Sequence, residues 1–168
     1  MEYCEDAQRV TSAQVREVLG REAEDYGWSK KTHDLMMAYV GKLTEVYGES
    51  WYVGVLSRDQ FFSILLPEHR HNFEEKKGYP VSFPLDTSLA DAVTLYKECP
   101  ERFAKECYEH IAQLKEKIHA EGFKTTVALV VIDGLLKHVD GLHRLIALGS
   151  LLDEGVAYEP IGVFVCCK

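Results

Sequence analysis

The sequence predicts an α+β fold, and three features of its C-terminal part indicate this class. Apolar residues recur every three or four positions in Pro100–Ala120, which is typical of an amphipathic helix. Thr125–Ile132 is a nearly continuous β-branched run, of the kind found in buried strands. The pair Asp133-Gly134 then precedes a second apolar run, Leu135–Val139, and Asp-Gly is a strong signal for a tight hairpin turn. Helices and a strand hairpin in one short chain indicate α+β architecture.

The N-terminal third predicts two helices that form a hairpin. Thr11 or Ser12 can cap a first helix over residues 15–26, where apolar residues recur at helical spacing. A second segment over residues 29–47 has one broad apolar face, and Gly48 suits the position just after its end. We expect this helical hairpin to pack on the rest of the chain.

The middle of the chain is less regular. Trp51–Leu56 is aromatic and β-branched and predicts a strand, and a second apolar run over residues 60–66 could be helix or strand. Residues 68–72 form a charged, imidazole-rich loop, and residues 73–84 contain several Gly and Pro residues that predict irregular structure. Ser88 can then cap a short helix.

Three elements complete the predicted order. The second strand of the hairpin ends at Asp140-Gly141, and residues 142–152 form a helix. Gly155 interrupts the helical pattern, and residues 161–166 are apolar enough for a final strand. The C-terminal part therefore reads as helix, strand, turn, strand, glycine loop, helix and strand.

Length and charge limit the class of protein. A chain of 168 residues is one domain by default, and we divide it into a helical extension, 1–48, and an α+β domain, 49–168. The net charge is −8 and the isoelectric point is about 5.4. Lysine and arginine form no long basic run, which argues against a nucleic-acid partner. No apolar run approaches the roughly 20 residues that a membrane helix needs, so we also expect no membrane partner.

Cysteine usage indicates the compartment. The five cysteines show no C-x-x-C spacing, and the polar, acidic N-terminus does not resemble a targeting segment. We therefore expect a reduced, cytoplasmic protein with free thiols. Cys166 and Cys167 end the last predicted strand, where they can serve as small apolar residues.

A candidate anion site lies at the start of the helix over residues 142–152. Here the chain reads Asp140-Gly141-Leu142-His143-Arg144, a glycine turn between a strand and a helix. The first N–H groups of a helix have no internal partners and carry partial positive charge, so they suit a phosphate. The alternative is that the aspartate simply caps the helix and the arginine faces solvent. Short motifs match by chance, and both interpretations stay open on local sequence.

Other histidines could also belong to a site. His69 and His71, beside Glu68, have the alternating spacing that places two rings on one side of a strand. No second cluster with ligand spacing accompanies them, and Arg70 lies between them, so we expect a solvated loop and no metal site. His138 lies within the predicted hairpin, close to the glycine loop, and could line a pocket there.

The order of elements from residue 100 to 166, together with Asp140-Gly141-Leu142-His143-Arg144, resembles the ParB/sulfiredoxin-like domain superfamily. The resemblance does not extend to residues 1–48. The sulfiredoxin branch has its catalytic cysteine at the position of Leu142, which cannot act as a nucleophile. The chromosome-partitioning branch adds a DNA-binding domain. The D-G-x-H-R loop is closest to the free-serine-kinase branch, which carries D-G-H-H-R.

This resemblance implies a nucleotide-dependent kinase, using ATP or ADP with Mg²⁺, that acts on a small hydroxylated metabolite. It implies that Gly141, Leu142, His143 and Arg144 bind the phosphates, with His138 near the pocket. Glu68 follows an apolar run in a Pro-Glu-His context and is the candidate base. The candidate catalytic residues are then Glu68 together with Asp140, His143 and Arg144. The alternative function is a non-catalytic module that binds and senses a nucleotide. The acceptor molecule and the oligomeric state are not indicated by the sequence.

Overall fold

The computed structural model describes residues 7–25, 30–70 and 81–167, and its class is α+β, as predicted. The chain forms two compact units, each assembled from segments distant in sequence. The first unit contains residues 1–56, 125–140 and 160–168, and the second contains residues 57–124 and 141–159. Within the described ranges, no helix combines the length and the apolar character needed to cross a membrane.

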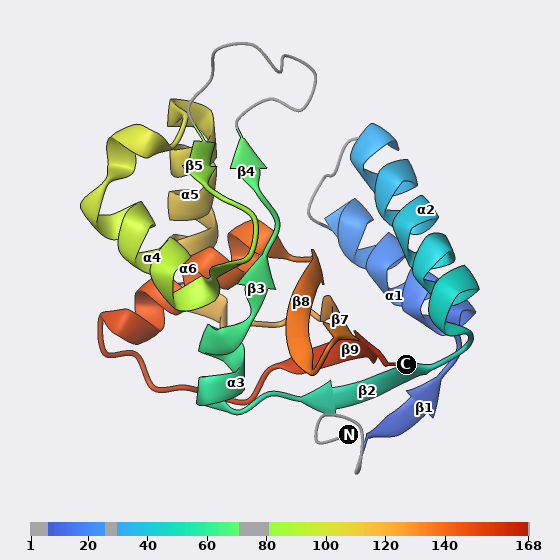
Figure 1. The fold of residues 1–168 in the computed structure, drawn as a ribbon. Helices are drawn as coiled ribbons and strands as arrows, with labels where there is room; N and C mark the ends of the chain where they lie inside the picture. Colours follow the sequence, from blue (N-terminus) through green and yellow to red (C-terminus); the bar gives the residue numbers. More distant parts are fainter. Residues whose placement is uncertain (1–6, 26–29, 71–80, 168) are drawn as a thin grey trace. The chain divides into compact units, whose positions relative to one another are not determined.

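The first unit contains a mixed sheet whose strands follow the order β1-β2-β9-β7-β8 (Figure 1). The strands are β1 (Gln8–Val10), β2 (Trp51–Val55), β7 (Val127–Ile132), β8 (Leu135–Asp140) and β9 (Gly162–Cys166). Strands β7 and β9 pair in parallel, and the other pairs are antiparallel. Asp133 and Gly134 have φ angles of 52° and 78°, the left-handed pair that closes a two-residue hairpin. The predicted β7–β8 hairpin is confirmed.

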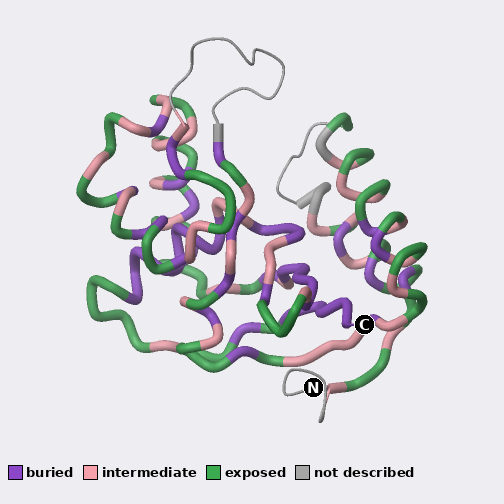
Figure 2. Tube along the Cα trace, viewed as in Figure 1, coloured by how far each residue is buried: buried purple, intermediate pink, exposed green. Residues whose placement is uncertain are grey.

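Helices α1 (Ser12–Asp25) and α2 (Lys30–Tyr47) cover one face of this sheet (Figure 1). Their apolar residues pack on side chains that alternate along the strands, so all of these strand residues point to the same face. The shared core comprises Val15, Leu19, Val40, Leu43, Trp51, Ala128, Val130, Val139, Phe164 and Cys166. Gly48 follows α2 with a φ of 72°, which confirms its predicted place after the helix end. Strands β7 and β9 are mostly buried, whereas the outer faces of the two helices are exposed (Figure 2).

The second unit is mostly helical. Its elements are α3 (Arg58–Ser63), β3 (Leu65–Leu66), β4 (His69–Arg70), β5 (Val81–Phe83), β6 (Thr87–Ser88), α4 (Leu89–Glu98), a 3₁₀ turn (Pro100–Arg102), α5 (Lys105–Glu121) and α6 (Leu142–Asp153). Every residue of α6 from Arg144 to Leu152 is buried, and α6 contacts both α4 and α5. Helix α6 is therefore the central helix of this unit (Figure 1).

The predicted single helix over Pro100–Ala120 is wrong at its start. Pro100 begins the separate 3₁₀ turn, and α5 starts only at Lys105. Phe103 between them is extended, with φ −100° and ψ 139°, and its ring meets the Tyr96 ring edge-on at 5.6 Å. The phenyl ring is buried in this position. Gly122 ends α5 with a φ of 80°, as predicted.

Other expectations for the middle of the chain also need correction. The segment predicted as a solvated loop contains β4, and His69 in it is only 6% exposed because it pairs with β5. The stretch predicted as irregular includes β5, while residues 71–80, with His71, lie outside the described residues. The run over residues 60–66 is both helix and strand, since α3 ends at Ser63 and β3 follows.

The expectation of free thiols is wrong for Cys167. Cys99, Cys107 and Cys166 are free, whereas Cys167 is disulfide-bonded. Cys166 is buried in β9, and burial raises the pKa of its thiol to about 11. Cys166 therefore serves as a small apolar residue at a strand end, as expected. Cys167, also expected there as a small apolar residue, forms a disulfide as well.

Candidate functional site

The glycine loop joins β8 to α6 through a single left-handed residue. Asp140 is the last residue of β8 and is 4% exposed, and Leu142 is the first residue of α6. Gly141 between them is the N-cap, with φ 99° and ψ 15°. Only glycine adopts this region without steric cost, so the glycine permits the strand to turn directly into the helix. The interpretation of Asp140 as the helix cap is therefore wrong.

Arg144 is the buried cation of the first turn of α6. Its side chain is 5% exposed, which contradicts the alternative of a solvent-facing arginine. The N-terminal end of a helix carries partial positive charge, so a cation there is of unfavourable sign and an anion is of favourable sign. Gly141 has no side chain with which to cap the first N–H groups. This end of α6 thus combines backbone donors and a guanidinium, the two groups that bind phosphate.

His143, beside Arg144, meets two residues from distant parts of the second unit. Its Nε2 lies 3.0 Å from Nε2 of His69 in β4, and Sγ of Cys107 in α5 lies 3.5 Å from each of these nitrogens. His69 is buried, and the other two are partly buried. Burial raises the pKa of the Cys107 thiol to about 11. We call these three residues the His-Cys-His cluster.

Aromatic rings lie beside both histidines of the His-Cys-His cluster. The His69 ring lies 5.2 Å from the Phe83 ring and 6.1 Å from the Phe103 ring, measured between centroids, and both phenylalanines are buried. The His110 ring lies 5.4 Å from the His143 ring, edge to face. The cluster therefore has an apolar wall on the His69 side, which strengthens polar interactions within it.

The structure brings together only some of the residues predicted for the site. Gly141, Leu142, His143 and Arg144 are consecutive at the start of α6, and Glu68 belongs to the same unit. Glu68 is exposed and directly precedes His69, so its chain neighbour, which was not predicted as a site residue, is the one that contacts His143.

Two further predicted residues, Asp140 and His138, belong to the other compact unit. Both lie on β8, where His138 is partly buried and stands opposite Leu129 of β7.

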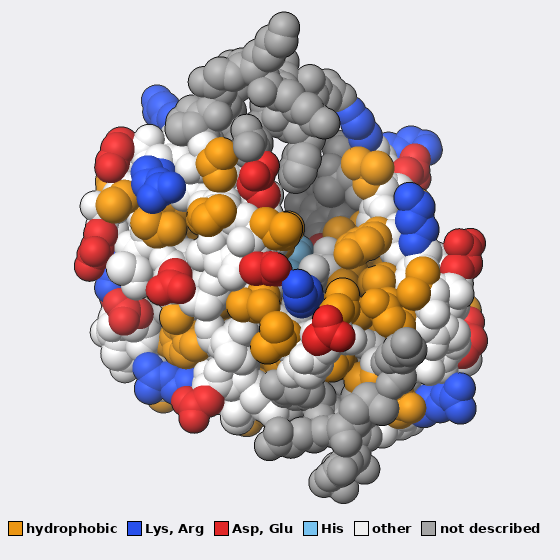
Figure 3. All heavy atoms as spheres, viewed as in Figure 1, with side chains coloured by type: hydrophobic (Ala, Val, Ile, Leu, Met, Phe, Trp, Pro, Cys, Tyr) orange, Lys and Arg blue, Asp and Glu red, His pale blue; other side chains and the backbone are white. Residues whose placement is uncertain are grey.

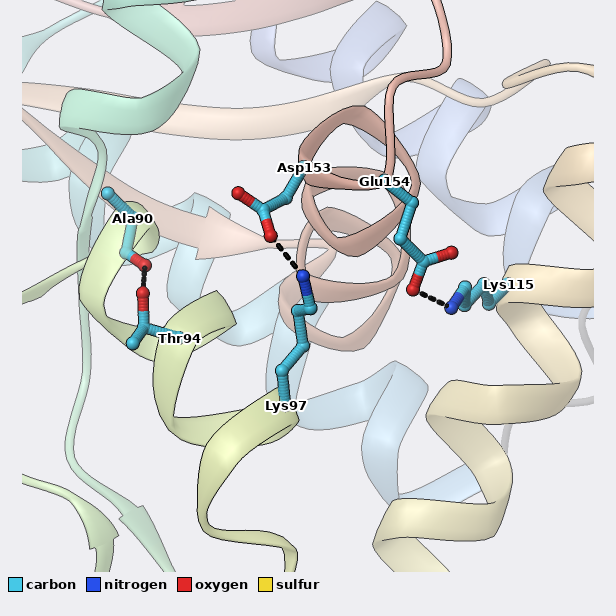
Figure 4. A network of polar contacts seen from close by, with 6 residues as sticks. All are labelled: Ala90, Thr94, Lys97, Lys115, Asp153 and Glu154. Atoms are coloured by element: carbon cyan, nitrogen blue, oxygen red, sulfur yellow. Dashed lines mark hydrogen bonds and ion pairs between the residues drawn. The ribbon is translucent and has the colours of Figure 1, made fainter.

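The opposite end of α6 carries acidic residues that are neutralised within the unit. Lys97 of α4 donates a hydrogen bond to Asp153, the last residue of α6, and Lys115 of α5 donates to Glu154 just beyond it (Figure 4). A cavity of about 530 Å³ lies beside these pairs, lined by residues of α4, α5 and α6 that include Tyr96. Since both lysines at this cavity are already paired, the cavity is less suited to an anion than the other end of the helix.

On the face drawn in Figure 3, lysine and arginine side chains lie scattered among aspartate and glutamate.

No family model, no curated protein and no solved structure matches this chain. The fold and the site are therefore interpreted from the chain's own residues.

Sequence reasoning identified the glycine loop and missed the rest of the His-Cys-His cluster. Cys107 recurs at helical spacing with the apolar residues of α5, which gave no sign of a ligand role, and His69 was assigned to a solvated loop. The three residues are separated by 36 and 38 positions, a spacing that matches no short ligand motif. Two signals were available: His143 belongs to the predicted phosphate loop, and His69 has the alternating spacing with His71 that was considered for a metal and set aside.

Proposed function

We propose that this protein is a nucleotide-dependent phosphotransferase that acts on a small hydroxylated compound. The terminal phosphates bind at the start of α6, where Gly141 allows the backbone to approach them. ATP or ADP donates the phosphoryl group, and Mg²⁺ accompanies the nucleotide. Its fold would be of the ParB/sulfiredoxin-like kind, and the element order from α5 to β9 supports that assignment.

One observation carries the proposal: Arg144 is a buried arginine in the first turn of a helix that begins at a left-handed glycine. A phosphate at this helix start would accept hydrogen bonds from the N–H groups of the first turn, where the helix dipole favours negative charge. The guanidinium of the same turn adds a positive charge and planar donors that match phosphate. This arrangement supports an anionic ligand at the start of α6.

Other residues have assigned roles in the same proposal. Glu68 takes the proton from the acceptor hydroxyl, and Asp140 binds Mg²⁺ or orients the acceptor. His143 fixes the loop through its contacts with His69 and Cys107, rather than donating to the transferred phosphoryl group. Phosphoryl transfer depends mainly on positioning and charge neutralisation, so fixing the loop contributes directly to the rate.

Nucleotide binding to an Arg144→Gln variant tests the proposal. The change removes the charge and keeps much of the side-chain length, and hydrogen bonds to charged groups contribute about 1.5–3 kcal/mol. We expect ATP or ADP to bind roughly 10- to 150-fold more weakly, measured by isothermal titration calorimetry. Assays with hydroxylated metabolites should show phosphoryl transfer by the wild type and loss of transfer in this variant.

Arg58→Gln provides the matched control. Arg58 is also the first-turn arginine of a helix, α3, but it is exposed, and Ser57 and Gln60 form a capping box there. Its substitution should leave nucleotide affinity unchanged. Equal affinity in wild type and Arg144→Gln would contradict the proposal, and tight binding without any transfer would favour the non-catalytic sensing module.

A further inference from the structure

The His-Cys-His cluster converges on one point from three elements of the second unit. His69 lies on β4, Cys107 lies in the first turn of α5, and His143 lies in the first turn of α6. Their ligand atoms, two imidazole nitrogens and one sulfur, all lie within 4.8 Å of one another. Among the described residues, no other histidine, cysteine, aspartate or glutamate joins this group.

The distances fit a tetrahedral zinc ion. Zinc binds imidazole nitrogen at about 2.0–2.1 Å and thiolate sulfur at about 2.3 Å, so two nitrogen ligands lie about 3.3 Å apart and a nitrogen–sulfur pair about 3.5 Å apart. The cluster has a nitrogen–nitrogen distance of 3.0 Å and two nitrogen–sulfur distances of 3.5 Å. A shift of a few tenths of an ångström between His69 and His143 would complete one face of the tetrahedron.

Hydrogen bonding alone accounts poorly for this triangle. An imidazole nitrogen has either one hydrogen or one lone pair in the ring plane, so it makes one strong hydrogen bond. Each Nε2 atom here faces two polar atoms at once, the other Nε2 and Cys107 Sγ. A cation at the centre would let all three atoms direct a lone pair to the same place, which is the arrangement of metal ligands.

The donor set selects a particular class of metal. Thiolate and imidazole ligands suit zinc, whereas Mg²⁺ prefers oxygen ligands. Two histidines and one cysteine also bind copper in electron-transfer sites, where a weak axial methionine is usual. The segments that supply the cluster, residues 57–124 and 141–159, contain no methionine. Zinc is therefore the metal that this set fits best.

We propose that His69, Cys107 and His143 bind one Zn²⁺ ion, which leaves its fourth position to water or another small ligand. Binding releases the thiol proton of Cys107 to solvent, because the thiolate is the ligand. The ion would join β4 and α5 to the first turn of α6, beside Arg144. This site does not depend on the phosphotransferase function, and it is distinct from any Mg²⁺ that accompanies a nucleotide.

Metal binding by the purified full-length chain tests the proposal. After chelator treatment in the absence of oxygen, the protein should bind one Zn²⁺ per chain in competition with a chromophoric zinc indicator. Co²⁺ in place of zinc should give a near-ultraviolet thiolate charge-transfer band and the intense visible bands of a four-coordinate ion. The cobalt spectrum is read on the wild-type protein, so it does not depend on any variant folding.

Cys107→Ser is the diagnostic variant, since serine differs from cysteine only by oxygen in place of sulfur. Loss of an outer partner of a metal ligand typically costs about 10- to 100-fold in affinity, so loss of a ligand should weaken zinc binding by more than about 100-fold. Cys99→Ser and His119→Ala are matched controls, because Cys99 is a free thiol and His119 is an exposed histidine of α5. Both controls should retain zinc affinity.

Two results would overturn the zinc site. One is wild-type affinity for zinc no higher than that of Cys107→Ser, and the other is a cobalt spectrum without the thiolate band. Nucleotide affinity, measured on the zinc-free wild type, reports separately on the phosphotransferase proposal. Failure of one proposal is therefore distinguishable from failure of the other.

Discussion

The two ends of α6 differ in burial and in the sign of the charges that they carry. Each end carries charge of the sign that the helix dipole disfavours, with Arg144 at the positive end and Asp153 and Glu154 at the negative end. At the C-terminal end the acidic residues are exposed, and lysines from α4 and α5 neutralise them. At the N-terminal end the arginine is buried, and the helix begins at a glycine that offers no side-chain cap.

The two ends therefore differ in what they can offer an anionic ligand. Surface pairs between lysine and carboxylate resolve the charge at the C-terminal end within the protein itself. At the N-terminal end, an incoming anion would interact favourably with the arginine and the helix dipole together.

The body of α6 between the two ends should show the largest effect on stability. A Cβ atom added at Gly149 would lie 2.5 Å from Cγ2 of Val93 in α4, and Val93 is itself buried. Gly149→Ala should therefore destabilise the protein by about 1–3 kcal/mol through overpacking. Chemical denaturation with urea measures this change. An unchanged unfolding midpoint would contradict this, because it would mean that α4 and α6 can move apart enough to admit the methyl group.

A pair of glycine substitutions compares the two ends directly. Gly141 precedes α6 with a φ of 99°, and Gly155 follows it with a φ of 98°. Alanine in this left-handed region costs about 1–2 kcal/mol at either position. The unfolding free energies of Gly141→Ala and Gly155→Ala should therefore fall by similar amounts. Only Gly141→Ala should also weaken nucleotide binding, and equal nucleotide affinity in both variants would remove the distinction between the ends.

The smallest effect is expected for the lysine pairs at the C-terminal end. A double-mutant cycle with Lys97→Met and Asp153→Asn should give a coupling energy below about 1 kcal/mol, decreasing with added salt, because the pair is near the surface. Nucleotide affinity should not change in any member of the cycle. A coupling energy of several kcal/mol would contradict the interpretation of this ion pair as a weak surface interaction.

The same pair has a defined pH dependence. The hydrogen bond to Asp153 raises the pKa of Lys97 above its ordinary value of 10.5. A raised lysine pKa contributes stability fully below the unfolded value and loses it as pH rises through the folded value. The coupling energy should therefore be constant between pH 7 and about pH 9 and decline only in more alkaline solution. Urea denaturation of the four proteins of the cycle at several pH values checks this.

Local sequence patterns predicted the turn residues and helix ends. The Asp133-Gly134 turn and the glycines at 48 and 122 adopt the positive φ angles that their contexts required. The start of α5 could not be predicted, because the extended backbone at Phe103 depends on its contact with Tyr96. The burial of Arg144 likewise depends on packing, and the local motif was equally consistent with an exposed side chain.

The sequence alone was sufficient to predict the α+β class, the strand hairpin, its turn residues and the glycine at the start of α6, because periodicity and backbone preferences act over a few neighbouring residues. Only the tertiary structure decided that His69, Cys107 and His143 meet, since they are 36 to 74 positions apart and come together through the packing of β4, α5 and α6. Burial and long-range contact are properties of that packing. They determine which of the chain's polar residues can act as a site.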